Sequence, residues 1–169
     1  MKKLLFLPLL ALLLMGTTAS AQQPKFGHID TNQLLRVMPG REDAQAQLEK
    51  YARDLESQFT TMQTELQTKY TDYLANEATF SELIRQSKQR EITSLQERIQ
   101  DFQEMAQQDL MQTENRLLSP IIEAARIAIE DVAKENGYSY VFDTSTGSVL
   151  YFPPSDDILN LVKAKLGIN

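Results

Sequence analysis

The chain has 169 residues, a net charge of −6, no cysteine and one histidine, His28. The lack of cysteine excludes disulfides, and the acidic balance argues against binding of nucleic acid through bulk charge. The sequence contains no glycine-rich phosphate loop, no nucleophile motif and no cluster of metal ligands, so we expect neither an enzyme nor a protein that needs a cofactor or metal. His28 is therefore expected to be a packed or surface side chain and not a catalyst.

Residues 1–21 are predicted to be a secretory signal peptide that is cleaved before Gln22. Lys2 and Lys3 precede an apolar run over residues 4–15, and small residues at 19–21 are typical of a cleavage site. The run is shorter than the roughly 20 residues that span a bilayer, which argues against a membrane anchor. The mature chain would hold 15 basic and 23 acidic side chains, a net charge of −8, and we expect it to be exported without stable membrane insertion.

The mature chain is expected to open with a short strand over residues 26–30, because its side chains alternate between two faces. Asp30 or Thr31 can cap a short helix over residues 32–37. The pair Pro39-Gly40 then interrupts the chain before a much longer element.

Residues 40–134 contain no proline except Pro120 and no glycine after Gly40, and they predict two long helices. Mostly apolar side chains recur at alternating spacings of three and four, as in a heptad seam, and in the second arm the period drifts towards 3.6 after Ala106. In the first arm, about 41–75, these are Leu48, Ala52, Leu55, Phe59, Met62, Leu66, Lys69 and Tyr73. In the second arm, about 80–134, they are Ile92, Leu95, Ile99, Phe102, Ala106, Leu110, Leu117 and Ile121. We predict an antiparallel hairpin in which Thr79 and Glu82 form a capping box for the returning helix.

After the hairpin, Pro120 predicts a bend in the second helix, and Asn136-Gly137 predicts its end. Residues 138–143 and 148–152 are predicted to be two strands of a β-hairpin joined by residues 144–147. Ser155 is predicted to cap a final helix. The apolar face of that helix is formed by Ile158, Leu159, Val162 and Leu166.

These elements predict an α+β fold in which residues 22–40 and 119–169 form a small base and residues 41–118 form an inserted helical hairpin. Only about fifty mature residues lie outside the stretch 40–134. That number is small for an independent core, and short strands leave open edges, so we expect the base to oligomerise. The strand residues expected in the oligomerisation base are Ile29, Val141 and Leu150.

The order of a signal peptide, a strand ending in Asp30, two long charged helices, and the endings Tyr140-Val-Phe-Asp143, Val149-Leu-Tyr151 and Asp157-Ile158 resembles the Skp/OmpH family of periplasmic chaperones. The resemblance implies a homotrimer whose base strands close a small β-barrel. Three helical tentacles would then enclose a cavity for unfolded outer-membrane β-barrel proteins. The best-known members are strongly basic, whereas residues 41–118 here carry nine Lys and Arg against fifteen Asp and Glu, a net charge of −6.

Five side chains are candidates for client binding because they lie off the seam or at the tip: Tyr51, Tyr70, Leu74, Phe80 and Leu83. Because the arms are acidic, apolar contacts would have to supply the affinity for acidic clients. Another interpretation is that these residues only widen the contact between the arms. The competing function is a structural coiled-coil adaptor or spacer of the cell envelope that binds one specific partner, and the breadth of binding distinguishes the two.

Overall fold

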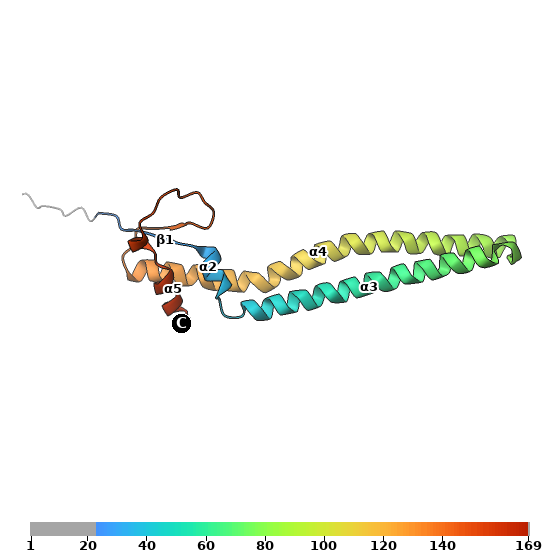
Figure 1. The fold of residues 1–169 in the computed structure, drawn as a ribbon, viewed down its shortest axis with the longest axis horizontal. Helices are drawn as coiled ribbons and strands as arrows, with labels where there is room; N and C mark the ends of the chain where they lie inside the picture. Colours follow the sequence, from blue (N-terminus) through green and yellow to red (C-terminus); the bar gives the residue numbers. More distant parts are fainter. Residues whose placement is uncertain (1–22, 169) are drawn as a thin grey trace, which may run out of the picture.

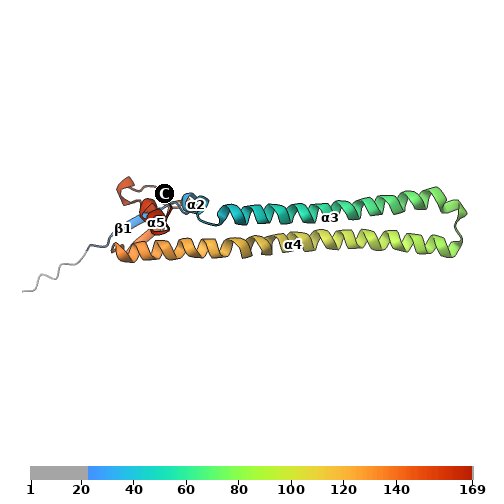
Figure 2. The same cartoon turned by 90° about the horizontal axis from the view of Figure 1, so that it is seen from below.

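The computed structural model describes residues 23–168, and the predicted signal peptide and its cleavage site lie outside them. Figure 1 shows a small base at one end and a long two-helix arm that extends from it. The arm consists of α3 (Arg41–Asn76) and α4 (Glu82–Glu135), and α4 continues past α3 into the base (Figures 1 and 2). The α+β fold with an inserted antiparallel hairpin is therefore confirmed.

The base contains a two-stranded parallel sheet. Strand β1 (Phe26–Ile29) pairs with β2 (Tyr140–Asp143), and Phe26 lies opposite Tyr140. Parallel strands need a long crossover connection, and here the crossover is α2 (Thr31–Arg36) followed by the whole hairpin. The hairpin is thus an insertion between two neighbouring strands.

The predicted β-hairpin between residues 138–143 and 148–152 is wrong. Residues 148–152 form no strand, and the segment 144–153 is a loop that projects from the base (Figure 1). The reason is that the end of β2 is tied to β1: the backbone N–H of Thr144 donates to the carbonyl of Ile29 at 2.9 Å. This bond extends the parallel ladder and leaves the next residues free to turn away.

The far end of this loop returns to the sheet beside His28. The Nε2–H of His28 donates to the carbonyl of Pro153 at 3.0 Å, and the centre of the His28 ring lies 4.3 Å from that of Phe152. His28 is only 6% exposed, which confirms the prediction of a packed side chain. Asp157 then forms a parallel bridge to His28, and the N–H of Ile158 donates to the carbonyl of His28 at 3.0 Å.

The start of the last helix, α5 (Leu159–Lys165), differs from the prediction. Ser155 lies inside the short 3₁₀ helix η2 (Pro154–Asp156) and does not cap α5. Instead, the Asp157 carboxylate accepts a hydrogen bond from the N–H of Leu159 at 2.8 Å. An acidic side chain two residues further along thus satisfies a free N–H at the helix start.

The base core lies between the sheet, α2, the last part of α4, and α5. Its fully buried side chains are Ile29, Leu34, Ile158 and Val162. The rest of the buried cluster consists of Met38, Ala44, Ile121, Ala125, Ala128 and Val132. At Gly27 a Cβ atom would lie 3.0 Å from the ring of Tyr138 and 3.2 Å from Ile158, so glycine is needed for this close approach.

The turn at the far end of the arm is closed by a different residue from the one predicted. The hydroxyl of Thr79 donates to the carbonyl of Asn76 at 2.7 Å and closes the 3₁₀ helix η1 (Glu77–Thr79). Ser81 then caps α4, because its Oγ accepts from the N–H of Ile84. The predicted Thr79–Glu82 capping box is wrong by two residues, since the chain needs a full 3₁₀ turn before it can reverse.

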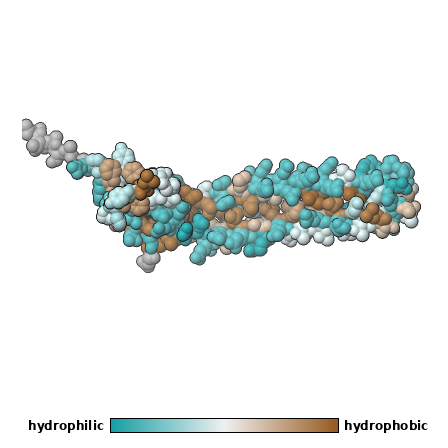
Figure 3. All heavy atoms as spheres, turned by 45° about the horizontal axis from the view of Figure 1, so that its top comes forward, coloured by the Kyte–Doolittle hydropathy of each residue, from teal (hydrophilic) through white to brown (hydrophobic). Residues whose placement is uncertain are grey.

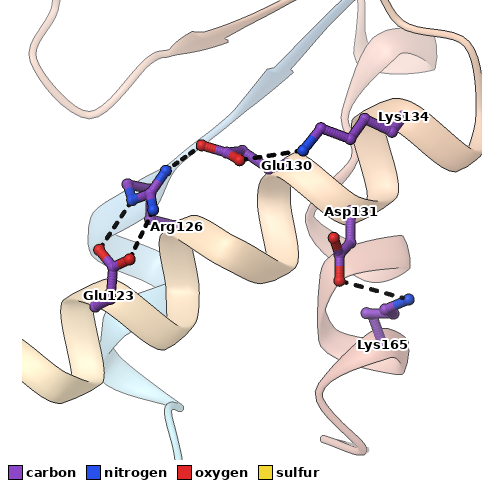
Figure 4. A network of polar contacts seen from close by, with 6 residues as sticks. All are labelled: Glu123, Arg126, Glu130, Asp131, Lys134 and Lys165. Atoms are coloured by element: carbon purple, nitrogen blue, oxygen red, sulfur yellow. Dashed lines mark hydrogen bonds and ion pairs between the residues drawn. The ribbon is translucent and has the colours of Figure 1, made fainter.

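Helix α4 remains helical across Pro120, and Figure 1 shows its axis changing direction towards the base. Beyond the proline, a ladder of ion pairs joins Glu123, Arg126, Glu130 and Lys134 along one face (Figure 4). Lys165 of α5 lies 3.8 Å from Asp131 of α4. The exposed pairs within α4 support the helix beyond the proline, and the Lys165 pair ties α5 to it.

The helix ends as predicted at Gly137, whose φ is +70°. The N–H of Tyr138 donates to the carbonyl of Ala133 at 2.9 Å, and the N–H of Gly137 donates to that of Lys134 at 3.3 Å. This pair of bonds is a Schellman motif, and it directs the chain into β2.

The core of the base predicts a contrast between two neighbouring positions of the last segment. Ile158→Ala removes a fully buried side chain and should lower the free energy of unfolding by about 2–5 kcal/mol. Leu161→Ala, at a side chain that is 44% exposed, should cost about 1 kcal/mol or less. Urea denaturation followed by circular dichroism measures both. Equal losses would show that α5 is not packed on the core.

Candidate functional site

The surface of the arm consists of a narrow apolar seam and mostly polar flanks. Figure 3 shows hydrophobic side chains gathered along the line between the two helices, with hydrophilic side chains on either side. Every predicted seam side chain is buried or half-buried, which confirms the heptad interpretation. The most buried cluster of the seam is Met62, Leu95 and Ile99. The seam thus supplies the main apolar contact between the two helices.

Three of the five candidate client-binding residues are exposed near the tip. Tyr70 is 48%, Leu74 56% and Leu83 73% exposed. Phe80 is half-buried, and its ring lies 6.3 Å from that of Tyr73, which is itself buried. The turn thus brings Leu74 and Leu83 to the same end of the arm as surface residues, while Phe80 closes the end of the seam.

Tyr51 has a different position. Its hydroxyl donates a hydrogen bond to the carboxylate of Asp109 on the opposite helix. This bond is the main reason why the pKa of Tyr51 is raised. Tyr51 is half-buried and joins the two arms, so it is a brace between α3 and α4.

Two further apolar side chains are exposed on α4. Met105 is 61% and Met111 60% exposed. Met105 borders a hollow of about 400 Å³ between the arms, together with Leu55, Phe102 and Asp109. The sequence alone marks both methionines as adaptable apolar side chains off the heptad seam, although they are not among the five client-binding candidates.

The outer face of the base sheet is aromatic and exposed. Phe26, Tyr140 and Phe142 lie with ring centroids 5.9–6.3 Å apart and are 45–62% exposed. The loop after β2 adds Leu150 and Tyr151, which are 96% and 85% exposed. Among residues 23–168, no strand pairs with the second edge of β2. The strand alternation places these aromatic residues opposite the buried face, but only the position of β2 beside β1 assembles them.

The three predicted oligomerisation residues occupy different environments. Ile29 is 1% exposed in the core of its own base, and Val141 packs against the same core. Only Leu150 is on the surface. Of the three, Leu150 alone is available for direct contact with a partner.

The carboxylate of Asp143 joins the end of β2 to the start of α2 through hydrogen bonds. One carboxylate oxygen accepts from the N–H groups of Ser145 and Thr31 at 2.9 and 3.3 Å, and the other accepts from the Thr31 hydroxyl at 2.7 Å. Burial raises the pKa of this carboxyl, but the hydrogen bonds from Ser145 and Thr31 outweigh burial, and the pKa is lowered.

Comparisons with known proteins agree with this geometry. The family model for outer membrane protein (OmpH-like) matches residues 25–166. The chain belongs to the OmpH-like family.

Relatives extend the comparison to nearly the whole chain. The chaperone protein Skp of Yersinia enterocolitica is 27% identical over 150 residues, which cover 86% of this chain and 88% of that protein. Skp of Photorhabdus luminescens is 25% identical over 149 residues, with the same coverage. The crystal structure of an OmpH-like protein from Caulobacter crescentus shares the fold, with a TM-score of 0.73 and 17% identity over 85% of this chain and 83% of that one.

Membership of the OmpH-like family gives the chain a chaperone role and not an enzymatic one. Within residues 23–168, no three His, Asp or Glu side chains come together as a metal site. In the same part of the chain, no helix has the length and apolarity that a membrane span requires.

The Asp143 network predicts a pH dependence of the OmpH-like base. Because the folded pKa is lowered, the stabilisation is complete above the unfolded pKa of about 4, and it is lost as the pH falls through the folded value. Asp143→Asn should therefore reduce stability at pH 7 and flatten the fall in stability below about pH 5. Urea denaturation at a series of pH values tests this. Asp101→Asn, at an exposed position, is the control and should leave the slope unchanged.

Proposed function

We propose that the chain is a periplasmic holdase chaperone that binds unfolded outer-membrane proteins and prevents their aggregation during transit to the outer membrane. Clients would lie in a cavity between the helical hairpins of a homotrimer. Family membership and relatives named as Skp chaperones support the proposal. The periplasmic location rests on the predicted signal peptide and on the resemblance to this family.

The observation that carries the proposal is the set of exposed apolar side chains on the arms. Tyr70, Leu74, Leu83, Met105 and Met111 are 48–73% exposed, although the seam between the helices is already filled. They are spread along the arm and do not line one deep pocket. Dispersed, adaptable apolar contacts suit a protein that binds many unrelated segments weakly, because flexible side chains can repack around each one.

The aromatic face of the base supports the oligomeric part of the proposal. Large exposed apolar surfaces on a soluble protein are typical of interfaces, and an unpaired strand edge invites pairing with another chain. A second copy covering Phe26, Tyr140, Phe142 and the Leu150 loop would remove both features from water. The trimeric state follows the family resemblance.

The proposal is tested by breadth of protection. Several unrelated β-barrel proteins are denatured in urea and diluted with and without the chain, and light scattering records their aggregation. A holdase should suppress aggregation of most of them at near-stoichiometric amounts. Protection of a single protein would instead favour the adaptor, and protection of none would contradict the proposal.

Three exposed residues near the tip are predicted to contact clients. Replacing Tyr70, Leu74 and Leu83 together by serine should raise the concentration needed for half-protection at least about fivefold, since about 1 kcal/mol of apolar contact is lost. Helical content should stay near wild type, because all three side chains are exposed. The matched control replaces the exposed Gln58, Gln63 and Gln96 by serine, and it should protect like wild type. Equal protection by both variants would exclude the tip as a contact site.

A charge in the exposed loop after β2 is predicted to dissociate the proposed oligomer. Leu150→Asp places a charge on a side chain that contacts little in its own chain, so the base should fold but no longer associate. Light scattering coupled to gel filtration should then give the monomer mass at micromolar concentration, where wild type gives an oligomer. Ser148→Asp in the same loop is the control for added charge. A wild-type mass for Leu150→Asp would exclude this loop from the interface.

A further inference from the structure

One stretch of α4 has an unusual charge. Between Arg98 and Arg116 the helix contains no basic residue. Its four acidic residues, all exposed, are Asp101, Glu104, Asp109 and Glu114. The negative charge of this stretch is therefore not balanced by any basic residue of its own helix.

These carboxylates form no ion pair within the fold of residues 23–168. In the described part of the chain, no Lys or Arg lies within 4.0 Å of any of them. On α3, Lys50 pairs with Asp54 at 2.7 Å and Arg53 with Glu49 at 3.9 Å, so these cations are engaged within their own helix. Asp109 accepts a hydrogen bond from Tyr51, which orients its carboxylate without cancelling its charge.

The exposed methionines lie between these charges. Met105 follows Asp101 by four residues and precedes Asp109 by four, so the three side chains form one row along α4 with steps of about 6 Å. Met105 also borders the hollow whose floor includes the half-buried Leu55 and Phe102. This row thus combines an adaptable apolar side chain with a negative charge on either side.

An extended polypeptide matches this row. Alternate residues of an extended chain point to the same face and lie about 6.6 Å apart, close to the helical step between Asp101, Met105 and Asp109. We propose that this surface of α4 binds extended segments of unfolded clients in which an apolar residue has a Lys or Arg two positions away on each side. The apolar side chain packs on Met105 and the hollow, and the flanking cations pair with the carboxylates.

This inference rests on the proposed holdase function and adds a selection by charge. Segments with acidic flanks meet like charges on α4 and are left to the apolar tip, where no such row exists. The arms therefore offer two surfaces: an apolar one at the tip and an acidic one nearer the base.

The test uses two fluorescent synthetic peptides. One repeats lysine, serine, leucine and serine, and the other has glutamate in place of lysine. Fluorescence anisotropy with the full-length mature protein should show the lysine peptide binding about three- to tenfold more tightly at about 0.05 M salt, the effect of two exposed ion pairs. At about 0.5 M salt the Debye length falls to roughly 4 Å, and the difference should largely disappear.

Matched variants assign the effect to this surface. Asp101→Asn with Asp109→Asn removes both charges of the row and should remove most of the preference for the lysine peptide. Glu42→Gln with Glu56→Gln removes the same charge from exposed positions of α3 and should keep the preference. Equal loss in both variants, equal binding of the two peptides, or binding of neither would overturn the inference. The aggregation assay reports separately on the holdase function, because protection of barrel proteins can persist without any charge preference.

Discussion

The parallel pairing of β1 with β2 is the constraint on which the rest of the molecule depends. Two strands of four residues each cannot be stable alone, and they are distant in sequence, so their pairing requires that the helical hairpin return to its point of departure. The return is fixed by the Gly137 end of α4 and by the Asp143 carboxylate, which holds Thr31 and Ser145. The register of the sheet therefore determines where the arm begins and in which direction it extends.

Burial is divided unevenly between the base and the arm. The base holds a contiguous core that includes four fully buried side chains, whereas the strongly buried cluster of the arm is Met62, Leu95 and Ile99. Because local stability follows the density of buried contacts, the arm is the part of the molecule that deforms at lower cost. A compliant arm suits a chaperone, because its surface can adjust to different unfolded segments.

The basic and acidic side chains of the arm differ in how far they are paired. Basic side chains on the arm are mostly engaged in pairs, such as Lys69 with Glu65 and Glu91, and Lys88 with Asp72. The acidic side chains of α4 between Arg98 and Arg116 are not. The net negative charge of the arm therefore disfavours long-range attraction of acidic chains. The fold is shared with the OmpH-like structure from Caulobacter crescentus.

The sequence by itself determined the features that depend on neighbouring residues. The seam positions, the Asp30 cap, whose carboxylate accepts from the N–H of Gln33, and the helix end at Gly137 follow from helical periodicity and from backbone groups within one turn. The tertiary structure decided what depends on distant segments. Residues 140–143 pair with β1 and not with residues 148–152, because hydrogen bonds from Thr144 to Ile29 and from Thr31 to Asp143 fix the strand end. Tyr51 joins the two arms only because Asp109 lies opposite it. Leu150 is exposed only because residues 148–152 form no strand. Both outcomes depend on where the chain returns in space and not on local sequence preference.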